Sequence, residues 1–248
     1  MKEARTSGNM SPGLRRVAER ARRNPHERQF ALAYLIDVDT LRRAYHRLRK
    51  GAAVGVDGVS KEEYGENLEE NLQDLHVRLK AMKYRHQPIR RVHIPKDKNR
   101  TRPIGISTTE DKIVQGALHE ILEAIYEQDF LRCSYGYRPN TGALEAVDKL
   151  TVKLQFGRYN YVVEADIKGF FDNINHDLLL EMLAVRIDDK ALLWLIKKWL
   201  KAGILEEDGQ VTHPTTGTPQ GGIISPILAN VYLHDALDEW FQEVVKKH

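Results

Sequence analysis

The chain has 248 residues, of which 42% are hydrophobic, so it is long enough to bury a sizeable core in one large domain or two lobes. No apolar run approaches the roughly 18 to 20 residues that a membrane span needs, and the N-terminus lacks the apolar core of a signal peptide. These observations predict a cytoplasmic protein without a membrane partner. Cys133 is the only cysteine, which excludes an internal disulfide and a cysteine-held zinc site, and the ten histidines lack metal-binding spacing.

The net charge of +3 hides an uneven distribution along the chain. Residues 1–50 carry 13 Lys or Arg against 5 Asp or Glu, and residues 78–102 carry 10 against the single acid Asp97. The remaining segments, 51–77 and 103–248, have net charges of −6 and −8. Solvated faces would explain an isolated charged run. Two concentrated basic blocks in an otherwise acidic chain instead indicate a surface that neutralises a phosphate backbone.

The first third of the chain alternates between loops and helices. Residues 1–29 are basic and carry Pro12 and Pro25, which predicts a loosely ordered arm. Apolar residues recur at helical spacing in residues 39–50 and again in residues 60–83. The segment GAAVGVDGVS between these two helical stretches is predicted to be a glycine-rich loop.

The next segment changes from helical periodicity to the alternation of a strand. Residues 89–94 and 102–106 are predicted strands, and the polar turn KDKNRT between them predicts a basic hairpin. Ser107 and Glu110 form an S-x-x-E pattern, which is typical of a capping box at the start of a helix. Apolar residues at helical spacing continue from this cap to Ile125.

Helices and one apolar strand are predicted in residues 142–202. Helical patterns cover residues 142–155, 176–186 and 190–202. Between the first two, an apolar strand is predicted at residues 161–163, and it leads through Asp166 into a turn around Gly169.

The C-terminal part predicts a hairpin and a final helix. Asp208 and Gly209 lie in the middle of residues 204–213, and Asp-Gly is a strong hairpin signal. The loop TTGTPQGGIIS then leads into a helix with Ser225 as its N-cap and Pro226 in its first turn. The mixture of hairpins and helices around a sheet predicts an α+β fold.

Asp166 is the sharpest chemical clue in the sequence. A carboxylate at the end of a strand, beside a turn, is well placed to hold Mg²⁺, which prefers oxygen ligands and shares them with phosphates. The backbone carbonyl of Ile167 is a candidate second ligand. An Asp that only caps a turn is the alternative. Asp172, six residues on, could share the face of Asp166 or cap the next turn, so it is assigned no role.

Seven motifs, in this order, carry a resemblance to a known family. They are GVDG at 55–58, RRVHIPK at 90–96, TRPIGI at 101–106, DKIVQ at 111–115, SYGYRP at 134–139, ADIKGFFD at 165–172 and GTPQGGIISPILAN at 217–230. Each motif alone is weak, but their order and spacing over residues 38–248 resemble the successive blocks of a group II intron-encoded reverse transcriptase, or maturase.

The resemblance implies a right-hand polymerase fold, an α+β architecture, with only its fingers and part of its palm present. A basic N-terminal arm would cover residues 1–37, the fingers residues 38–158, and the partial palm residues 159–248. The implied activity is RNA-directed DNA polymerisation, a nucleotidyl transfer. It would need two Mg²⁺ ions, with Mn²⁺ as a substitute, and deoxynucleoside triphosphates as substrates. The implied nucleic-acid partners are structured RNA, as intron or template, and a DNA primer.

The resemblance also assigns roles to matched positions. Asp166 would be catalytic and bind both metal ions, with Ile167 contributing its carbonyl. Phe171 would lie under the sugar and exclude a 2′-hydroxyl, although core packing is its alternative. The other implied nucleotide-binding residues, for which a generic basic surface is the alternative to the two cations, are Lys96, Arg102, Gln220 and Gly221. The residues expected to contact RNA are Arg90, Arg91 and Arg138, although no contact can be derived for the last.

One departure from the family changes the expected activity. The family continues beyond the last helix into a hairpin with a YADD-type motif whose aspartates complete the metal site, and this sequence ends at His248 without it. The chain alone is therefore expected to be inactive, and a chain that supplies the missing palm and thumb is an expected partner. A non-catalytic RNA-binding module that assists intron splicing is the alternative. A two-metal nuclease is disfavoured because the sequence has no carboxylate cluster.

Overall fold

The structure is a computed structural model that describes residues 10–97 and 100–245, with the side chains of Lys96 and Asp97 outside the described part. The helices are α1 (Pro12–Arg23), α2 (Val38–Arg47), α3 (Lys61–Glu66), α4 (Leu68–Lys80), α5 (Thr109–Tyr126), α6 (Ala143–Phe156), α7 (Phe170–Asn173), α8 (His176–Arg186), α9 (Lys190–Leu200) and α10 (Ser225–Leu233). The strands are β1 (Gln29–Phe30), β2 (Ile89–Asp97), β3 (Arg100–Ile106), β4 (Ile187–Asp188), β5 (Ile204–Leu205) and β6 (Val211–Thr212). Three further turns of helix are η1 (Ala33–Leu35), η2 (His234–Glu239) and η3 (Phe241–Val245).

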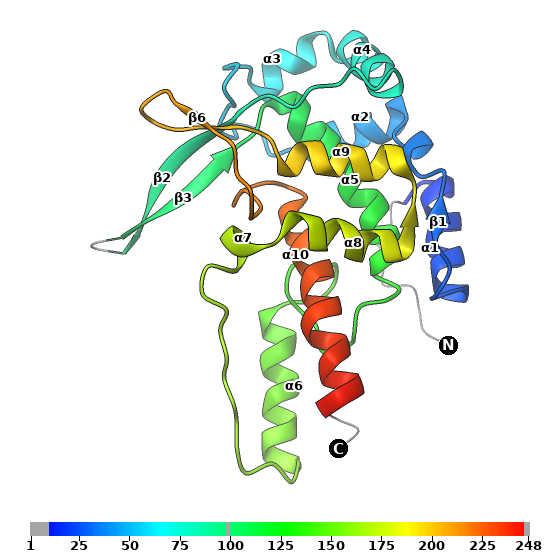
Figure 1. Ribbon diagram of the computed structural model, residues 1–248, viewed down its shortest axis with the longest axis vertical. Helices are drawn as coiled ribbons and strands as arrows, with labels where there is room; N and C mark the ends of the chain where they lie inside the picture. The colour runs from blue at the N-terminus through cyan, green and yellow to red at the C-terminus, as the bar shows by residue number, and fades with distance from the viewer. Residues whose placement is uncertain (1–9, 98–99, 246–248) are drawn as a thin grey trace.

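Helix α5 is the centre of the molecule, and α1 and α2 pack against it (Figure 1). Fourteen of its residues are buried, from Thr109 to Tyr126, because apolar side chains occupy more than one face. Its N-cap is Thr108, whose hydroxyl accepts a hydrogen bond from the backbone N–H of Asp111. The predicted capping box of Ser107 and Glu110 was therefore wrong by one residue, because Thr108 offers the same cap chemistry one position later.

Helix α1 corrects the prediction of a loosely ordered N-terminal arm. Ser11 caps the helix, Pro12 lies in its first turn, and Leu14, Ala18 and Ala21 are buried against α5. Because Pro is compatible with the first turn of a helix, the two prolines that suggested disorder bracket the helix instead. Residues 1–9 of the predicted arm lie outside the described residues.

The basic hairpin is formed as predicted. Strands β2 and β3 are antiparallel, with Arg90 opposite Ile106 and Ile94 opposite Arg102, and the hairpin extends away from the helices (Figure 1). At its base, β2 pairs in parallel with β5, which pairs with β6 in the predicted Asp-Gly hairpin. The described sheet order is β3-β2-β5-β6, so the C-terminal hairpin extends the sheet of the basic hairpin.

A single buried core joins the N-terminal and C-terminal parts of the chain. It runs from Leu14 through α5 to Leu179, Leu192 and Val231. Buried side chains from all three predicted parts of the chain pack in this one core. The division of the chain into residues 1–37, 38–158 and 159–248 therefore stays a prediction. None of the described helices is long and apolar enough to cross a bilayer.

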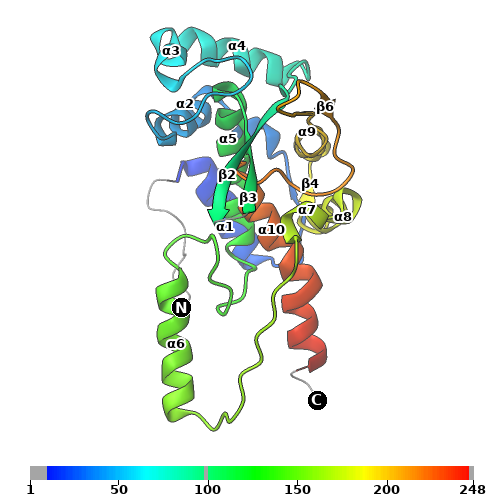
Figure 2. The same cartoon turned by 90° about the vertical axis from the view of Figure 1, so that its left-hand side faces the viewer.

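The predicted strand at residues 161–163 is absent from the structure. Residues 157–168 form an exposed segment without regular structure, in which Tyr161 and Val163 are 90% and 92% exposed. The preceding helix α6 is formed as predicted but buries none of its residues. A strand needs neighbouring backbone groups to pair with, and no described strand lies beside this segment. Figure 2 shows α6 standing apart from the C-terminal helix formed by α10, η2 and η3, with this segment running from the lower end of α6 up to α7.

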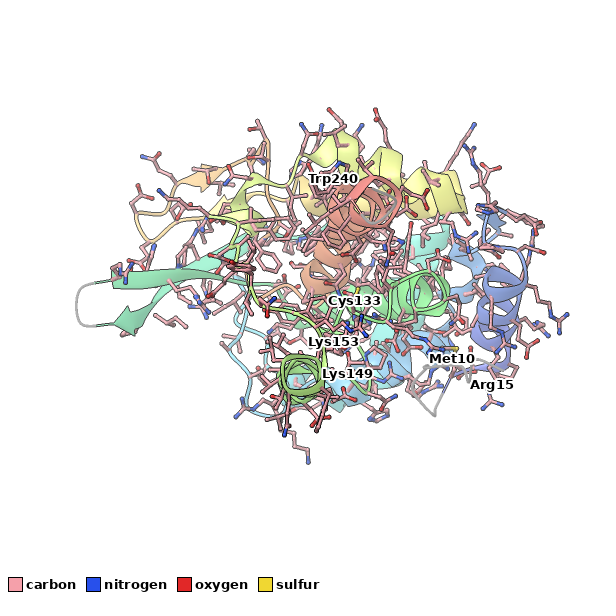
Figure 3. The ribbon with its side chains drawn as sticks, turned by 90° about the horizontal axis from the view of Figure 1, so that it is seen from below. Met10, Arg15, Cys133, Lys149, Lys153 and Trp240 are labelled. Atoms are coloured by element: carbon pink, nitrogen blue, oxygen red, sulfur yellow. The ribbon has the colours of Figure 1, made fainter. Side chains whose placement is uncertain are left out.

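The C-terminal helix and α6 lie on opposite sides of the loop that carries Cys133. In the view from below, Trp240 on the C-terminal helix and Lys149 and Lys153 on α6 flank this loop (Figure 3). Helix α10 begins at Ser225, with Pro226 in its first turn. Its N-cap is Ile224 and not the predicted Ser225, whose hydroxyl donates to the carbonyl of Pro219 instead.

Candidate nucleotide and nucleic-acid site

The TPQGG loop, residues 218–222, is held against α7 by backbone hydrogen bonds. The N–H of Thr218 donates to the carbonyl of Phe171 at 2.7 Å, and the N–H of Gly217 donates to the carbonyl of Ile174 at 2.7 Å. Gly217 has φ +84°, and a Cβ there would lie 2.7 Å from the carbonyl oxygen of Asp172. Only glycine fits this position without strain, so the loop can approach α7 closely.

The same loop is also attached to the basic hairpin. The N–H of Gly105 on β3 donates to the carbonyl of Gln220 at 2.7 Å. Gly221 has φ +103°, and a Cβ there would lie 2.8 Å from the carbonyl oxygen of Gly105. A cavity of about 330 Å³ lies at this junction, and its walls include Arg91, Asp172 and Gln220. The structure thus brings the hairpin, the TPQGG loop and α7 to one place.

Phe171 lies at this junction and Asp166 lies on the segment that precedes it. The Phe171 ring is partly buried and meets the ring of Tyr137 edge-on, with the ring centroids 6.4 Å apart. Asp166 is exposed, and Ile167 is 52% exposed. No group of three or more His, Cys, Asp or Glu within residues 10–97 and 100–245 could hold a metal ion. The described residues therefore supply one candidate carboxylate but not a complete two-ion site.

The hairpin cations differ in what they contact. Arg102 is exposed and makes no ion pair with a described carboxylate. Arg90, on the same face of the hairpin, donates through Nη2 to the carbonyl of Val54 at 2.7 Å, and the Arg91 guanidinium lies 3.2 Å from the Glu206 carboxylate. Among Arg90, Arg91 and Arg102, the last is therefore best placed for a ligand, whereas Arg90 joins the hairpin to the loop after α2.

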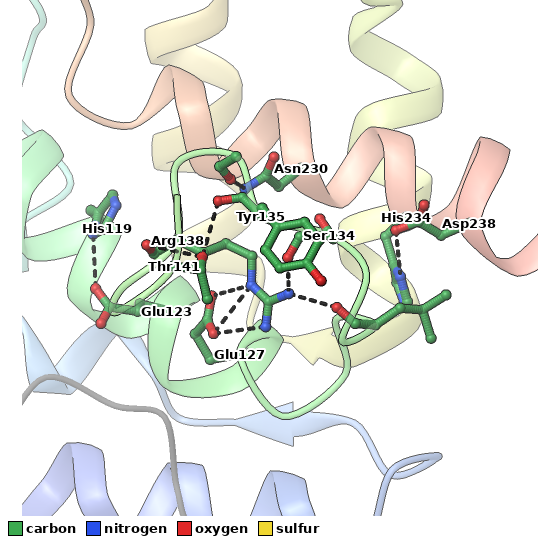
Figure 4. Close-up of polar contacts among 12 residues, drawn as sticks. His119, Glu123, Glu127, Ser134, Tyr135, Arg138, Thr141, Asn230, His234 and Asp238 are labelled. Atoms are coloured by element: carbon green, nitrogen blue, oxygen red, sulfur yellow. Dashed lines mark hydrogen bonds and ion pairs between the residues drawn. The ribbon is translucent and has the colours of Figure 1, made fainter. Parts of the chain in front are cut away.

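Arg138 is buried in an internal network, so its expected contact with RNA stays a prediction (Figure 4). Its Nε and Nη2 donate to the Glu127 carboxylate at 3.0 Å, and its Nη1 donates to the carbonyls of Leu131 and Ser134 at 2.7 Å. A buried guanidinium needs such partners, because desolvating an unpaired charge is costly. The side chain therefore holds the CSYGYRPN loop in shape.

A second and larger cavity, of about 980 Å³, lies between α2, the GAAVGVDGVS loop and α5. Five Lys or Arg residues line it, and two of them pair with carboxylates: Arg47 with Glu120 at 2.8 Å, and the buried Arg138 with Glu127 at 3.0 Å. Lys61 and Lys112 instead donate to the carbonyls of Leu48 and Ala53. The fifth cation is Arg49.

The cavity is positively charged because Lys61 and Lys112 bond to main-chain carbonyls, which do not neutralise the charge of an ammonium group. Glu123 is the one acidic residue that lines it. His119, 3.4 Å from Glu123, adds no charge near neutral pH, because burial and the nearby Arg47 lower its pKa to about 4 (Figure 4). Tyr137 at the edge of the cavity is 70% exposed, so its ring is available for stacking.

Sequence reasoning missed the cavity cations Arg49, Lys61 and Lys112. Lys61 and Lys112 lie in acidic surroundings in the sequence, and only the packing of the GAAVGVDGVS loop on α5 brings them together. The signal for that packing was Gly55, because a Cβ there would lie 2.5 Å from the Cα of Thr108. Such a close backbone approach requires glycine.

The family model described as "Reverse transcriptase (RNA-dependent DNA polymerase)" matches residues 94–247. The chain therefore belongs to the reverse transcriptase family. The matched range includes the end of the basic hairpin, α5, α7 and the TPQGG loop, which are the elements that form the candidate nucleotide site. The α+β fold expected from the sequence is confirmed.

Individual relatives place the chain beside the intron-encoded members of the family. It is 38% identical over 236 residues to the group II intron-encoded protein LtrA of Lactococcus lactis, covering 94% of this chain and 39% of that protein. It is 39% identical to protein YkfC of Escherichia coli, covering 78% of this chain and 51% of that protein. It is 34% identical to the putative COX1/OXI3 intron 1 protein of Saccharomyces cerevisiae, covering 86% of this chain and 25% of that protein. The predicted resemblance is thus confirmed, and the chain spans a quarter to a half of these relatives.

A solved structure shares the fold. A chain of the "Partial Cas6-RT-Cas1--Cas2 complex" superposes with a TM-score of 0.51 at 23% identity, covering 88% of this chain and 35% of that chain. At this level of identity the likeness supports the architecture of the fold and not an activity.

Proposed function

We propose that this chain forms the fingers and part of the palm of an RNA-directed DNA polymerase of the group II intron type. The observation that carries the proposal is the junction of the basic hairpin, the TPQGG loop and α7 in a chain of the reverse transcriptase family. A module that only binds intron RNA is not favoured, because the matching family model is that of the polymerase.

The junction suits a deoxynucleoside triphosphate. Arg102 and Lys96 on the hairpin would bind the triphosphate, since cations on neighbouring strands can converge on one polyanion. Gln220 and Gly221 would contact the nucleotide from the loop, where two glycines let the backbone come close. Phe171 would lie under the sugar and exclude a ribose 2′-hydroxyl.

The metal ligands that the chain would supply are the Asp166 carboxylate and the Ile167 carbonyl. These oxygen donors fit Mg²⁺, or Mn²⁺ in its place, and the metal would assist attack by the primer 3′ oxygen. Two adjacent divalent ions repel each other and need several anionic ligands, whereas Asp166 belongs to no described group of three or more metal-binding side chains. We therefore expect the 248-residue polypeptide by itself to be inactive, and a partner chain to complete the site.

The large cavity suits the RNA template. Arg47, Arg49, Lys61 and Lys112 would neutralise successive phosphates, while Tyr137 offers a ring on which an unpaired base can stack. Structured RNA, either an intron or a template paired to a DNA primer, is the partner with this combination of phosphates and exposed bases.

The test measures binding of a fluorescent RNA template annealed to a DNA primer by anisotropy, over a range of salt concentrations. Arg49→Gln combined with Lys112→Gln should weaken binding about tenfold and lower the slope of log affinity against log salt by about 2. The matched control, Lys197→Gln with Lys201→Gln on exposed positions at the end of α9, removes the same charge elsewhere. Equal losses in the two double variants would mean that the cavity is not the RNA site.

A further inference from the structure

Gln115 on α5 joins two elements of the candidate nucleotide site through its side-chain amide. It is 1% exposed, and the polymerase roles assigned above do not involve it. Its Nε2 donates to the hydroxyl of Ser107, the residue that follows β3, at 3.0 Å. Its Oε1 accepts from the backbone N–H of Ile223, which follows the TPQGG loop, at 2.9 Å. A backbone N–H can only donate, so these partners fix which way the amide is oriented.

The position of the loop depends on these two hydrogen bonds. A Cβ at Gly222 would lie 3.3 Å from Gln115 Oε1 and 2.8 Å from the Trp199 ring, so the loop passes closely over the glutamine. Two residues earlier, the carbonyl of Gln220 accepts from Gly105 on β3. Gln115 therefore anchors the end of a loop whose middle is attached to the hairpin.

We propose that Gln115 is a positioning residue that sets the affinity for the incoming deoxynucleotide by holding Gln220 at a fixed place relative to Arg102. This inference rests on the proposed function of the junction. Without the amide oxygen, the Ile223 N–H loses its partner in a part-buried site, and the loop must shift to find another. A shift of the loop moves Gln220 away from the nucleotide. Ile223 also lines the large cavity, but the cations proposed to bind RNA there, Arg47, Arg49, Lys61 and Lys112, lie on other elements.

The experiment titrates a deoxynucleoside triphosphate with Mg²⁺ onto the full chain bound to an RNA template and a DNA primer with a dideoxy end. The complementary nucleotide is compared with a non-complementary one. Gln115→Met, which keeps the length of the side chain but not its hydrogen bonds, should weaken binding of the complementary nucleotide about tenfold and leave duplex affinity unchanged. Tyr126→Phe is the matched control, since it removes a buried hydrogen bond from α5 to the Leu183 carbonyl, away from the loop.

A double-mutant cycle separates positioning from general destabilisation. Gln220→Ala should weaken nucleotide binding in the wild-type chain but have almost no further effect in Gln115→Met, because residues that act through one another are not additive. Additive losses, or a loss in Tyr126→Phe equal to that in Gln115→Met, would overturn the positioning role. If Gln115→Met does not fold, Ser107→Ala replaces it as a milder variant. Its effect should likewise be non-additive with Gln220→Ala, and additive losses would again overturn the positioning role.

Two further variants distinguish an error in the proposed nucleotide site from an error in the role of Gln115. Arg102→Ala and Gln220→Ala test the nucleotide site itself, because neither side chain is part of the Gln115 network. If both single variants bind nucleotide as tightly as the wild type, the junction is not the nucleotide site and the inference falls with it. If both weaken binding while Gln115→Met does not, the site stands and only the role of Gln115 is rejected.

Discussion

His119 shows how burial changes the chemistry of a single residue in this protein. Its pKa falls from an ordinary 6.5 to about 4, first because burial disfavours the charged ring and second because Arg47 repels it. Between these two pKa values the unfolded chain binds a proton that the folded chain does not. The contribution of His119 to stability is therefore fully present above about pH 6.5 and is lost as the pH falls towards 4.

The expected result is a loss of stability in mild acid that the variant His119→Asn does not share. Between about pH 7.5 and about pH 5, the wild type should lose about 2 kcal/mol of unfolding free energy relative to the variant. Urea unfolding at several pH values measures this difference. Asp235, whose pKa burial raises to about 6, acts in the opposite direction, but its contribution cancels in the comparison. Parallel pH profiles for the two proteins would contradict the assignment.

At the scale of elements, close backbone contacts between the hairpin and the TPQGG loop define the candidate site. Gly105 lies where they meet: a Cβ there would lie 2.7 Å from Ile89 Cγ2 and 3.2 Å from Pro219 Cβ. The Ile89 methyl is buried, so it has little room to move. The glycine is needed here for space and not for an unusual backbone angle.

Gly105→Ala is expected to lower the free energy of unfolding by about 1 to 3 kcal/mol, because the added methyl overpacks the junction. Gly136→Ala is the matched control, since a Cβ at that position meets nothing within 4 Å. The control should change stability by less than about 0.5 kcal/mol. Chemical denaturation of both variants gives the comparison. If Gly105→Ala has the same free energy of unfolding as the wild type, the loop moves freely away from the hairpin.

At the scale of the whole molecule, the elements around α5 are packed while the segment with Asp166 is not. Helix α5 and its neighbours bury a continuous core, whereas α6 buries none of its residues and Val162 and Val163 are exposed. Contiguous exposed apolar surface of this kind is typical of an interaction site. The carboxylate proposed to bind metal therefore lies on backbone that no described strand holds in place.

The 248-residue polypeptide is accordingly expected to show no primer extension on an RNA template with Mg²⁺ or Mn²⁺. Metal catalysis needs ligands fixed in position. The Asp166 segment has no described strand partner, and no group of three or more described His, Cys, Asp or Glu residues is placed to hold a metal ion. The same assay with Asp166→Ala controls for contaminating polymerase. Extension by the unchanged polypeptide that disappears in Asp166→Ala would contradict the prediction and require further carboxylate ligands in the chain.

Local patterns in the sequence were sufficient for most of the elements and for the family. The alternation of residues 89–106 predicted the basic hairpin, Asp208 and Gly209 predicted the turn between β5 and β6, and the ordered motifs predicted a reverse transcriptase. These features depend on neighbouring residues, whose side-chain periodicity and turn chemistry act whatever surrounds them. Gln220 and Phe171 were identified in the same way, although their roles in nucleotide binding stay predictions.

Tertiary structure alone decided the features that depend on contacts between distant segments. Arg138, predicted on an RNA surface, is buried because Glu127 and two carbonyls surround it, and no local pattern specifies such a network. Likewise, Gln115 joins Ser107 to Ile223, which lies 108 residues after the glutamine in the chain. The apolar residues 161–163 predicted a strand, but a strand forms only where other backbone pairs with it, and the described fold provides none.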